Sequence, residues 1–339
     1  MAIVPVARAE HLLAFVGLLR EIGVPVDREL ARARLPIFIE EMPEAWVSLE
    51  LAFRFLMRCA AREGIEDLGF EAGWPVRLED LSLELLDALD AAPTIKARLE
   101  CFIRFARLEA NTLRCTLIPE GNAVRVCIRE ELPSNVDERL SEWQIIKLLI
   151  EIVRSGAGRR WSPSEICLQS AREVHASVLD RLDGVNVHVG QPTTSFLIPA
   201  TIFAAPVWRW NSSDTSAAIS QRSFMDCPEV DFDGLVNTLR VTLTPYLASG
   251  YPPIELAAEI LSTSTRSLQR RLKEHQTSYS ELIDHLRFDM AAGMLADLDQ
   301  KIIDIAMRLG YEHSPNFSRA FRRISGLTPR QYRKSLAAN

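Results

Sequence analysis

The sequence contains few features of a secreted, membrane-spanning or metal-binding protein. Its six cysteines form no CxxC pair and lie mostly inside apolar stretches, which indicates small buried side chains in a reducing compartment. The six histidines show no spacing for a metal or for general-base chemistry. No stretch approaches the roughly 18 uncharged apolar residues that a spanning helix needs, and residues 1–15 meet an acid and a histidine before a signal-peptide core can form. We therefore expect a cytoplasmic protein with no membrane partner, no metal, no cofactor and no catalytic residue.

An excess of positive charge is absent from most of the chain and appears only at its C-terminal end. The 339 residues carry a formal net charge of −6. Residues 250–339 hold 13 Lys+Arg and 10 Asp+Glu, a net charge of +3, which leaves −9 for residues 1–249. Seven basic side chains and a single acid, Glu312, lie within 308–334. A solvated surface is one explanation, but a cluster of like charge repels itself unless a counter-charge is near, so the two parts are expected to meet different partners.

The chain divides into a mixed α and β part and a helical part. Its length, with 47% apolar and 25% charged residues, is typical of a soluble protein of two or three domains. Residues 211–231 are rich in Ser, Asp and Thr without apolar periodicity, which predicts a linker. We therefore predict an α+β domain over residues 1–210 and a second domain over residues 232–339.

Helical and strand patterns alternate within residues 1–210. Alternating apolar residues on both sides of the PEGN segment at 119–122 predict a β-hairpin. Apolar residues at three- and four-residue spacing predict amphipathic helices over 10–22, 46–63, 95–109 and 138–155. Further strands are predicted at 165–169, 185–189 and 194–198. Together these elements predict a small sheet packed by helices.

The C-terminal part contains an internal repeat, because residues 256–273 can be laid on residues 304–322. Each copy has the pattern of a short apolar helix, a tight connection and a second helix with a basic outer face, which is the helix-turn-helix arrangement. The predicted fold class is therefore mainly α, with an α+β N-terminal domain and an all-α C-terminal domain. In the latter, two helix-turn-helix motifs at about 254–275 and 302–323 are joined by a long helix at about 279–296. The matched pairs include Ala258 with Ala306, Leu261 with Leu309, Leu268 with Phe317, Arg270 with Arg319 and Leu272 with Phe321.

The second helix of the first motif has two distinct faces. Residues 265–275, TRSLQRRLKEH, contain four cationic side chains and follow Ser264, which stands where an N-cap belongs. At 100° per residue, Leu268 and Leu272 share one side of this helix, which is expected to pack. The opposite side, within an arc of about 100°, holds Arg266, Gln269, Arg270 and Lys273.

Three further helices have predicted starts. Ser278 with Glu281 predicts a capping box for the long joining helix. Ser314 followed by Pro315 predicts a cap with proline at the first helical position. Residues 328–333, which begin Thr-Pro, predict a last short helix.

The side chains on the projecting faces suit the major groove of DNA. Arginine can fork onto guanine O6 and N7, and glutamine or asparagine can pair with adenine. Other basic side chains, and a hydroxyl at a helix start, are better suited to phosphate, which fixes register without reading sequence. Two such units would address major-groove segments about one helical turn, roughly 34 Å, apart. The candidate base-reading residues are Arg266, Gln269, Arg270, Ser314, Asn316 and Arg319, and the candidate phosphate-binding residues are Lys273, Arg322, Arg323, Thr328 and Arg330.

Residues 254–333 resemble the DNA-binding domain of the AraC/XylS family of transcriptional regulators, whose second motif is carried here as IIDIAMRLGYEHSPNFSRAFRRISGLTPRQYR. The first motif departs from the family at Ser262, where a glycine is usual in the turn. This departure predicts strain in the turn or an altered presentation of the first recognition helix. The matching positions include Ala306, Gly310, Tyr311, Phe317, Arg319, Phe321, Gly326, Thr328, Pro329 and Tyr332.

A second resemblance covers about residues 20–208. Segments 67–73, 92–108 and 185–207 look like the "arabinose-binding-type" regulatory domain found in a subset of the same family. The resemblance implies a module that senses a small-molecule effector and can dimerise, and it does not imply arabinose. Bulky side chains that could enclose the effector, with ordinary core packing as the alternative, are Trp74, Phe102, Phe105, Trp143 and Trp161.

The two resemblances predict a sequence-specific DNA-binding transcriptional regulator, not an enzyme, controlled by a small-molecule effector of unknown identity. Its expected partners are the major groove of double-stranded promoter DNA, the effector, a second copy of the chain in a homodimer, and RNA polymerase. One alternative is a DNA-modifying or repair enzyme fused to a helix-turn-helix, which would need a reactive cysteine and a cysteine-rich zinc site. Another is a non-specific architectural DNA binder, for which a basic chain throughout would be expected.

Overall fold

The computed structural model describes residues 4–132, 137–207, 234–311 and 313–336. The chain divides into two compact units, an N-terminal one up to residue 230 and a C-terminal one from residue 231. The linker predicted over 211–231 lies outside the described residues. Among the residues that the structure describes, no helix is both long enough and apolar enough to cross a membrane.

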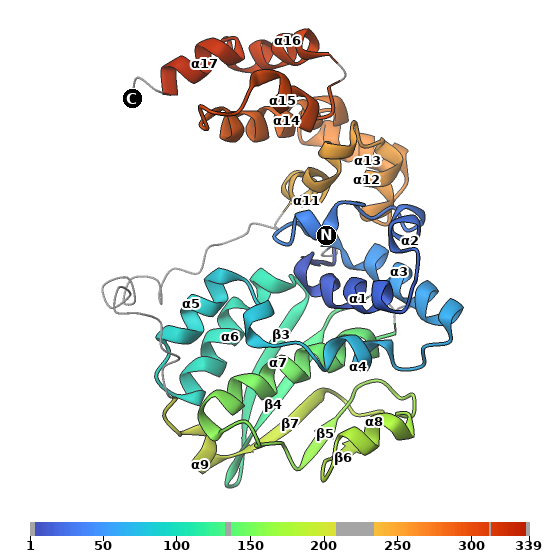
Figure 1. Ribbon diagram of the computed structural model, residues 1–339, viewed down its shortest axis with the longest axis vertical. Coiled ribbons are helices and arrows are strands. Elements are labelled where there is room, and N and C mark those ends of the chain that lie inside the picture. The colour runs from blue at the N-terminus through green and yellow to red at the C-terminus, as the bar shows by residue number, and fades with distance from the viewer. Residues whose placement is uncertain (1–3, 133–136, 208–233, 312, 337–339) are drawn as a thin grey trace. The chain divides into compact units, whose positions relative to one another are not determined.

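The N-terminal unit is built on a five-stranded sheet and a separate two-stranded sheet (Figure 1). The strands are β1 Val6–Arg8, β2 Trp46–Ser48, β3 Leu113–Glu120, β4 Ala123–Glu130, β5 Glu165–Cys167, β6 Asn186–His188 and β7 Thr194–Pro199. The larger sheet has the order β3-β4-β7-β5-β6, in which only β5 and β6 are parallel. Glu120 pairs with Ala123, so the predicted hairpin is confirmed and turns at Gly121 and Asn122. The strands predicted near β5, β6 and β7 are also confirmed.

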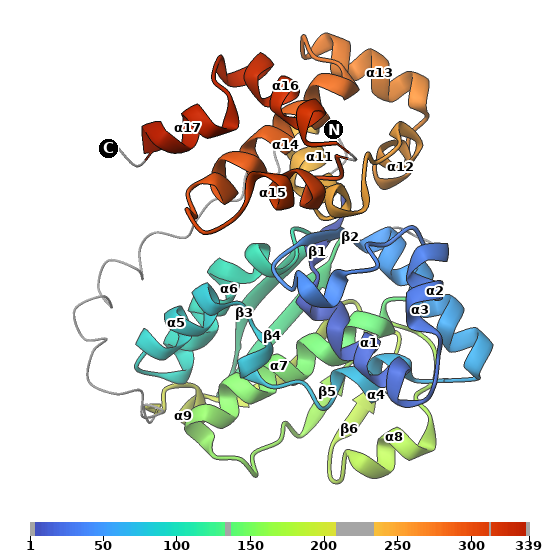
Figure 2. The same cartoon turned by 45° about the horizontal axis from the view of Figure 1, so that its top comes forward.

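Helices surround this sheet. They are α1 Glu10–Glu21, α2 Val26–Arg32, α3 Leu49–Glu63, α4 Leu68–Gly73, α5 Leu83–Ala91, α6 Ile95–Glu109, α7 Arg139–Ala157, α8 Ala176–Arg181 and α9 Ala200–Phe203, with 3-10 turns η1 Ile39–Glu41 and η2 Leu78–Asp80. In both views α6 and α7 run beside β3 and β4 (Figures 1 and 2). On β4, Val124, Val126 and Ile128 are buried, which is the alternation expected of a strand with one packed face.

The predicted helices over 10–22, 95–109 and 138–155 are confirmed as α1, α6 and α7. The helix predicted over 46–63 is wrong at its start, because Trp46–Ser48 form β2 and pair with β1. The side chain of Ser48 then accepts a hydrogen bond from the Leu51 N–H at 3.4 Å and caps α3. The pairing of β2 with β1, about 40 residues earlier, has no signature in the sequence around Trp46–Ser48. The apolar spacing that predicts the helix, by contrast, continues from β2 into α3.

Two glycines set the position of α7. A Cβ added at Gly69 of α4 would lie 2.2 Å from the Arg139 carbonyl oxygen, and one added at Gly73 would lie 2.8 Å from the Gln144 nitrogen. The backbones of α4 and α7 therefore approach more closely than any larger residue permits. This contact fixes the first turns of α7, which carry several polar side chains discussed below.

The described part of the C-terminal unit is all helical, as predicted. It comprises α11 Leu235–Leu243, η3 Thr244–Ser249, α12 Ile254–Ile260, α13 Thr265–Glu274, α14 Tyr279–Leu295, α15 Ile302–Arg308, α16 Ser314–Ser325 and α17 Pro329–Leu336. Helices α12 and α13 form the first helix-turn-helix motif, and α15 and α16 form the second. Helix α14 joins them and lies between them (Figure 2). The last helix runs to Leu336, beyond the end predicted near Arg333.

The predicted caps are confirmed for two of these helices. The Ser264 side chain accepts a hydrogen bond from the Ser267 N–H at 3.2 Å at the start of α13. Ser278 and Glu281 form a reciprocal capping box at the start of α14. The cap predicted at Ser314 is wrong: α16 begins at Ser314 itself, after His313, and no side chain caps it. Proline at the next position removes one N–H that would otherwise need a partner, so this helix start depends less on a cap.

The two helix-turn-helix motifs turn in the same way. After α12, the Ser262 and Thr263 N–H groups donate to the carbonyls of Glu259 and Ala258 at 2.9 Å. After α15, Gly310 and Tyr311 make the equivalent bonds to Met307 and Ala306. In this Schellman arrangement the first residue after the helix adopts a left-handed conformation. Its φ is 45° at Ser262 and 71° at Gly310, so the serine takes the conformation that favours glycine, as its departure from the family pattern predicts.

A buried arginine connects the two motifs. Arg287 of α14 is 7% exposed, and its guanidinium carbon lies 4.6 Å from the ring centroid of Tyr311 and 5.4 Å from that of Tyr251. Tyr311 belongs to the turn of the second motif, and Tyr251 precedes the first motif and packs edge-on against Tyr279. Because a cation is attracted to the faces of both rings, Arg287 holds the two motifs against one helix.

Reciprocal exchanges in the two turns should have opposite effects on stability. Ser262→Gly removes a left-handed side chain and should change the free energy of unfolding by less than about 1 kcal/mol, in the stabilising direction. Gly310→Ser should lower it by more than about 2 kcal/mol, because a Cβ there would lie 2.6 Å from Gly250 Cα and 3.0 Å from the Leu247 carbonyl oxygen. Urea unfolding followed by circular dichroism measures both. Equal destabilisation by the two exchanges would show that the turns are not equivalent in the way described.

Candidate nucleic-acid interface and interior cavity

Helix α13 exposes the face that the sequence predicts. Leu268 and Leu272 are fully buried, whereas the predicted projecting side chains Arg266, Gln269, Arg270 and Lys273 are all exposed. The Arg270 guanidinium lies 3.8 Å from the Glu274 carboxylate, and both side chains are largely exposed. An exposed pair of this kind contributes little to stability, so Arg270 can exchange Glu274 for another partner at small cost.

Helix α16 repeats this arrangement. Phe317 and Phe321 are buried against α14, α15 and α17, in a cluster that includes Phe288 and Tyr332. On the opposite side, Asn316 and Arg319 are exposed. The Arg319 Nη2 donates a hydrogen bond to Asn316 Oδ1 at 2.6 Å, so two candidate base-reading side chains hold each other in place. Ser314, at the start of the helix, is half-buried.

The candidate phosphate-binding residues have different surroundings. Lys273, Arg322 and Arg330 are exposed and form no hydrogen bond or ion pair with the described part of the chain. Arg323 forms an ion pair with Asp284 of α14. Thr328 is half-buried, and its hydroxyl donates to Gln331 Oε1 at 2.8 Å while accepting from the Gln331 N–H at 3.3 Å. The Thr328 hydroxyl therefore already caps α17, and the Arg323 guanidinium already has a partner.

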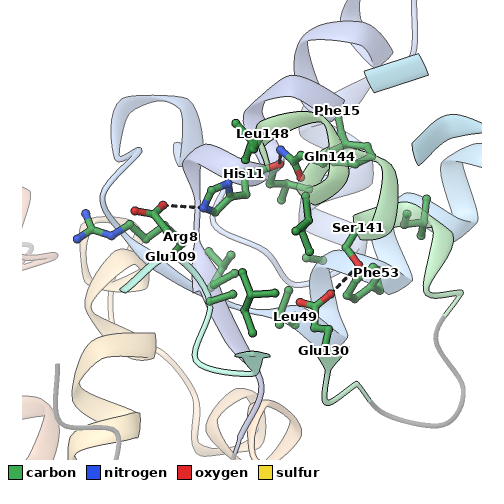
Figure 3. Close-up of a pocket in the computed structure, with 18 of the residues that line it drawn as sticks. Arg8, His11, Phe15, Leu49, Phe53, Glu109, Glu130, Ser141, Gln144 and Leu148 are labelled. Atoms are coloured by element: carbon green, nitrogen blue, oxygen red, sulfur yellow. Dashed lines mark hydrogen bonds and ion pairs between the residues drawn. The ribbon is translucent and has the colours of Figure 1, made fainter. Parts of the chain in front are cut away.

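The N-terminal unit contains a partly open pocket that reaches into its interior and is called the interior cavity below (Figure 3). It lies among α1, α3, α6, α7, β1 and β2, and most of its lining is aliphatic or aromatic, including Phe15, Leu49, Phe53 and Leu148. The volume open to the centres of water molecules is about 80 Å³. The polar residues that line it are Arg8, His11, Glu109, Glu130, Ser141 and Gln144.

At one side of the cavity, a hydrogen-bonded pair joins α1 to α6. His11 Nε2 and Glu109 Oε2 are 2.8 Å apart, and the second Glu109 oxygen accepts a hydrogen bond from Ser82. Burial is the largest single influence on the pKa of Glu109 and raises it, but the hydrogen bond and charge of His11, the hydrogen bond from Ser82 and the charge of Arg8 together lower this pKa below its ordinary value. Burial likewise opposes the charged form of His11, but the hydrogen bond to Glu109 and the negative charges of Glu109, Glu10 and Glu130 together raise the pKa of His11. The Arg8 guanidinium is held by the Leu108 carbonyl, Glu44 and Glu84.

One group here could hold a metal ion. Glu10, His11 and Glu109 bring three ligand atoms within 4.8 Å of one another. Both Glu109 oxygens, however, already accept hydrogen bonds from His11 and Ser82. Burial, followed by the charge of Glu109, raises the pKa of Glu10 to about 7. His11 and Glu109 are therefore already paired with each other, whereas Glu10 Oε1 is buried and has no hydrogen-bond partner among the described residues.

At another side of the cavity, Glu130 at the end of β4 meets the start of α7. The Ser141 hydroxyl donates to Glu130 Oε2 at 2.6 Å (Figure 3). Burial raises the pKa of Glu130 above its ordinary value, although the hydrogen bond from Ser141 and the charge of His11 oppose this. Gln144, one turn further along α7, donates through Nε2 to the His11 carbonyl oxygen at 3.1 Å. A carboxyl group, a hydroxyl and an amide thus face an otherwise apolar space.

Two family models cover most of the chain. The model described as "Arabinose-binding domain of AraC transcription regulator, N-term" matches residues 23–207, and the model described as "Helix-turn-helix domain" matches residues 257–335. The first match alone spans more than half of the chain. The chain belongs to the AraC family of transcriptional regulators. Its helix-turn-helix motifs are therefore DNA-binding elements, as predicted.

Curated AraC-type relatives match over nearly the full length. The "Ornithine utilization regulator" of Pseudomonas aeruginosa is 25% identical over 334 residues, 98% of this chain and 97% of the relative. The "HTH-type transcriptional regulator VirS" of Mycobacterium tuberculosis is 25% identical over 331 residues, 96% of each chain. Among solved structures, the transcriptional regulator CdpR from Pseudomonas aeruginosa matches with 22% identity and a TM-score of 0.42, over 91% of this chain and 96% of that one.

The structure does not gather the five aromatic residues predicted for an effector site of this AraC-family chain. Only Phe102 lines the cavity. Trp74 and Trp143 pack edge to face beside Phe70, and Trp161 packs against Phe196. Phe105 is buried in α6. The residues that the sequence analysis missed are the polar ones, His11, Glu109, Glu130, Ser141 and Gln144, which come from separate segments and follow no motif.

Four cysteines of this AraC-family chain are buried, as predicted: Cys59, Cys101, Cys115 and Cys127. Cys167 is half-buried, and Cys227 lies outside the described residues. Burial raises the pKa of Cys59 to about 11 and that of Cys115 to about 12. A thiolate nucleophile at either position is therefore disfavoured.

Glu10 should make the N-terminal unit lose stability as the pH rises. A carboxyl group whose pKa is raised in the folded state binds its proton more tightly there than in the unfolded chain, so its contribution is lost between its ordinary value of 4.5 and about 7. Glu10→Gln should therefore raise the free energy of unfolding on the order of 1 kcal/mol at pH 8 and change it little at pH 4.5. Urea unfolding at several pH values tests this, with the exposed Glu21→Gln on the same helix as control. A gain that is independent of pH would contradict it.

Proposed function

We propose that this AraC-family regulator reads a specific DNA site with α13 and α16 together and that a small molecule bound in its N-terminal unit controls this reading. The observation that carries the first part is the matched exposure on the two helices. In each, two large apolar side chains are buried and the amide and guanidinium side chains project from the opposite face.

The roles within the interface follow from side-chain chemistry. Arg270 and Arg319 can each present a planar guanidinium to guanine, and Gln269 and Asn316 can each pair with adenine. The hydrogen bond between Arg319 and Asn316 favours a shared reading of neighbouring bases. Arg266 lies on the same face of α13 as Gln269 and Arg270, and Ser314, half-buried in the first turn of α16, completes the proposed base-reading set.

Phosphate contacts are proposed for the remaining basic side chains. Lys273, Arg322 and Arg330 are exposed and are assigned to the DNA backbone. Arg323 would have to exchange Asp284 for phosphate, and Thr328 would contact DNA while it caps α17. We therefore expect these two to contribute less than Lys273 and Arg322.

Control by an effector is supported by the interior cavity, which is apolar in most of its lining and presents several polar groups. Such a space is typical of a small-molecule site. The cavity replaces the aromatic cluster of Trp74 and Trp143 as the proposed effector site. Homodimerisation and a contact with RNA polymerase remain predictions from the family resemblance.

The protein should discriminate strongly between its operator and other DNA. Titration of the full chain against the DNA upstream of its own gene and against scrambled duplex, at several salt concentrations, should give a specificity ratio on the order of 10³ or more. An architectural DNA binder would show almost no difference, and that result would refute the proposed function.

Single substitutions should separate base reading from phosphate binding. Arg270→Ala and Arg319→Ala should each relax base preference at a different position of the operator and weaken specific binding by about 1–3 kcal/mol. Lys273→Ala should weaken all sequences alike and reduce the salt dependence by about one phosphate contact. Arg308→Ala, which removes the same charge from the exposed face of α15, is the control and should leave base preference intact. Uniform losses in the three test variants would show that the roles are misassigned.

A further inference from the structure

Several buried acids in the N-terminal unit are matched by cations. Glu29 is 1% exposed, and its carboxylate lies within 3.1 Å of the guanidinium groups of Arg32, Arg58 and Arg62. Asp67 is paired with Arg139 at 3.1 Å. These contacts follow the general rule, because a carboxylate taken out of water is strongly destabilised unless an opposite charge compensates it.

Glu142, which is buried, and Glu130, which is half-buried, depart from this pattern. Glu142 is 6% exposed. Its Oε1 accepts hydrogen bonds from the Gln169 N–H at 2.7 Å and from Thr194, and its Oε2 has no hydrogen-bond partner among the described residues. Glu130 accepts a hydrogen bond from the Ser141 hydroxyl at 2.6 Å, and the Thr112 hydroxyl acts on its pKa as a second, neutral hydrogen-bond donor. Neither carboxylate forms an ion pair within the part of the chain that the structure describes, and residues 133–136 contain no lysine, arginine or histidine.

The surroundings of these two acids add to their negative potential. Burial is the largest influence on the pKa values of both acids and raises them. The charge of Glu142 further raises the pKa of Glu130, and the charge of Glu138 further raises the pKa of Glu142. His11 is the cation that acts on Glu130, but its Nε2 is already paired with Glu109. Lys147, on the same helix, is paired with Glu151.

These acids lie at a boundary of the cavity. Glu130 and Ser141 line both the main cavity and a smaller hollow that is also lined by Glu138 and Glu142. The main cavity has room for roughly five to eight water-sized groups. Away from Glu130, its walls are chiefly aliphatic and aromatic side chains of α1, α3 and α7 (Figure 3).

We propose that the effector is a small organic cation whose nitrogen-centred charge lies at Glu130 and whose apolar body, of roughly six to eight heavy atoms, fills the cavity between α1, α3 and α7. This inference rests on the proposed function, because it names the chemical class of the molecule that controls the regulator. A cationic ligand would supply the positive charge that Glu130 and Glu142 lack. A hydrogen bond between charged groups is also stronger than one between neutral groups.

Other ligand classes fit the site less well. A neutral apolar molecule would fill the cavity but leave the two carboxyl groups without a cationic partner. An anion would add a third negative charge next to them. An inorganic cation would meet the charge but leave the apolar walls uncovered, so that most of the contact area would contribute nothing.

Four probes separate these classes. Calorimetric titration of the full chain at pH 7 should show binding of n-hexylammonium, with hexan-1-ol at least about tenfold weaker, and thermal unfolding should shift upward with the same order of affinity. Hexanoate and ammonium chloride, which test charge sign and the need for an apolar body, should bind less well than hexan-1-ol or not at all. The proposal is overturned if the alcohol or the carboxylate matches n-hexylammonium, if ammonium chloride stabilises as much, or if no probe binds below about 10 mM.

Substitution of the carboxyl groups tests the position of the charge. Glu130→Gln keeps the size of the side chain and should lower affinity for n-hexylammonium at least about tenfold while leaving hexan-1-ol binding unchanged. Glu131→Gln, at the neighbouring exposed position, is the matched control and should bind as the unmodified chain does. Glu142→Gln can retain its accepted hydrogen bonds through Oε1 and should shift the preference in the same direction. If Glu130→Gln does not fold, Glu142→Gln decides. The proposal is overturned if either of these two test variants folds and still binds n-hexylammonium with the affinity of the unmodified chain.

Failure of this inference can be told apart from failure of the proposed function. Each sample is also titrated with operator and scrambled DNA in the absence of probe. Retained operator specificity without any preference for the cation sinks only the effector assignment. Absence of operator specificity in the unmodified chain, both without probe and with saturating n-hexylammonium, refutes the regulator itself.

Discussion

The contact of Arg287 with Tyr251 and Tyr311 determines how the C-terminal unit presents itself. A single guanidinium lies over one ring that precedes the first helix-turn-helix motif and one ring in the turn of the second. The arginine is buried, so both contacts operate in a setting where a cation over an aromatic ring is worth more than at the surface. The two helix-turn-helix motifs are therefore tied to α14 by the same side chain, and in the proposed function this contact would couple the placement of α13 on DNA to that of α16.

The two helices of each motif can meet at a defined angle only if the turn between them has a defined backbone geometry. In the second motif the turn contains Gly310, which lies so close to Gly250 that no side chain fits. The first motif uses Ser262 in a left-handed conformation with the same hydrogen-bond pattern. The geometry of the turn is therefore conserved within this chain although the residue is not, since backbone hydrogen bonds rather than the glycine define it.

The sequence predicts those parts of the structure that depend on local periodicity. Helices α6, α7, α13 and α14, the β3–β4 hairpin and the exposed face of α13 all follow from residue spacing, because an amphipathic helix or an alternating strand needs no distant partner to be recognised. The pairing of β1 with β2 could not be predicted in this way, and it converts Trp46–Ser48 from a helix start into a strand. The prediction of Ser314 as the N-cap of α16 was wrong because a proline is tolerated at the second as well as the first position of a helix, so Pro315 does not fix where the helix begins.

The interior cavity was beyond local prediction for a different physical reason. Its polar groups come from α1, α6, the end of β4 and the first turns of α7, and the close approach of α4 to α7 at Gly69 and Gly73 determines where the last of these lie. Large aromatic residues mislead in such a case, because Trp74 and Trp143 gain more from packing on each other and on Phe70 than from lining an open space. The informative signal is a buried acid without a cation, and it is visible only once the fold is known.

The free energy that a cation could gain at a carboxyl group without a cationic partner is comparable to the coupling free energy that regulation requires. Control of operator affinity by 5–150-fold requires a coupling of about 1–3 kcal/mol between effector and DNA, and a charged hydrogen bond contributes a comparable amount, about 1.5–3 kcal/mol. Glu130 ends a central strand, and its partner Ser141 begins α7, the helix that packs on both α4 and α6. A ligand that changes the charge at this junction therefore acts on the sheet and on the principal helix of the N-terminal unit at the same time, which a ligand confined to an aromatic cluster on the surface of α7 would not do.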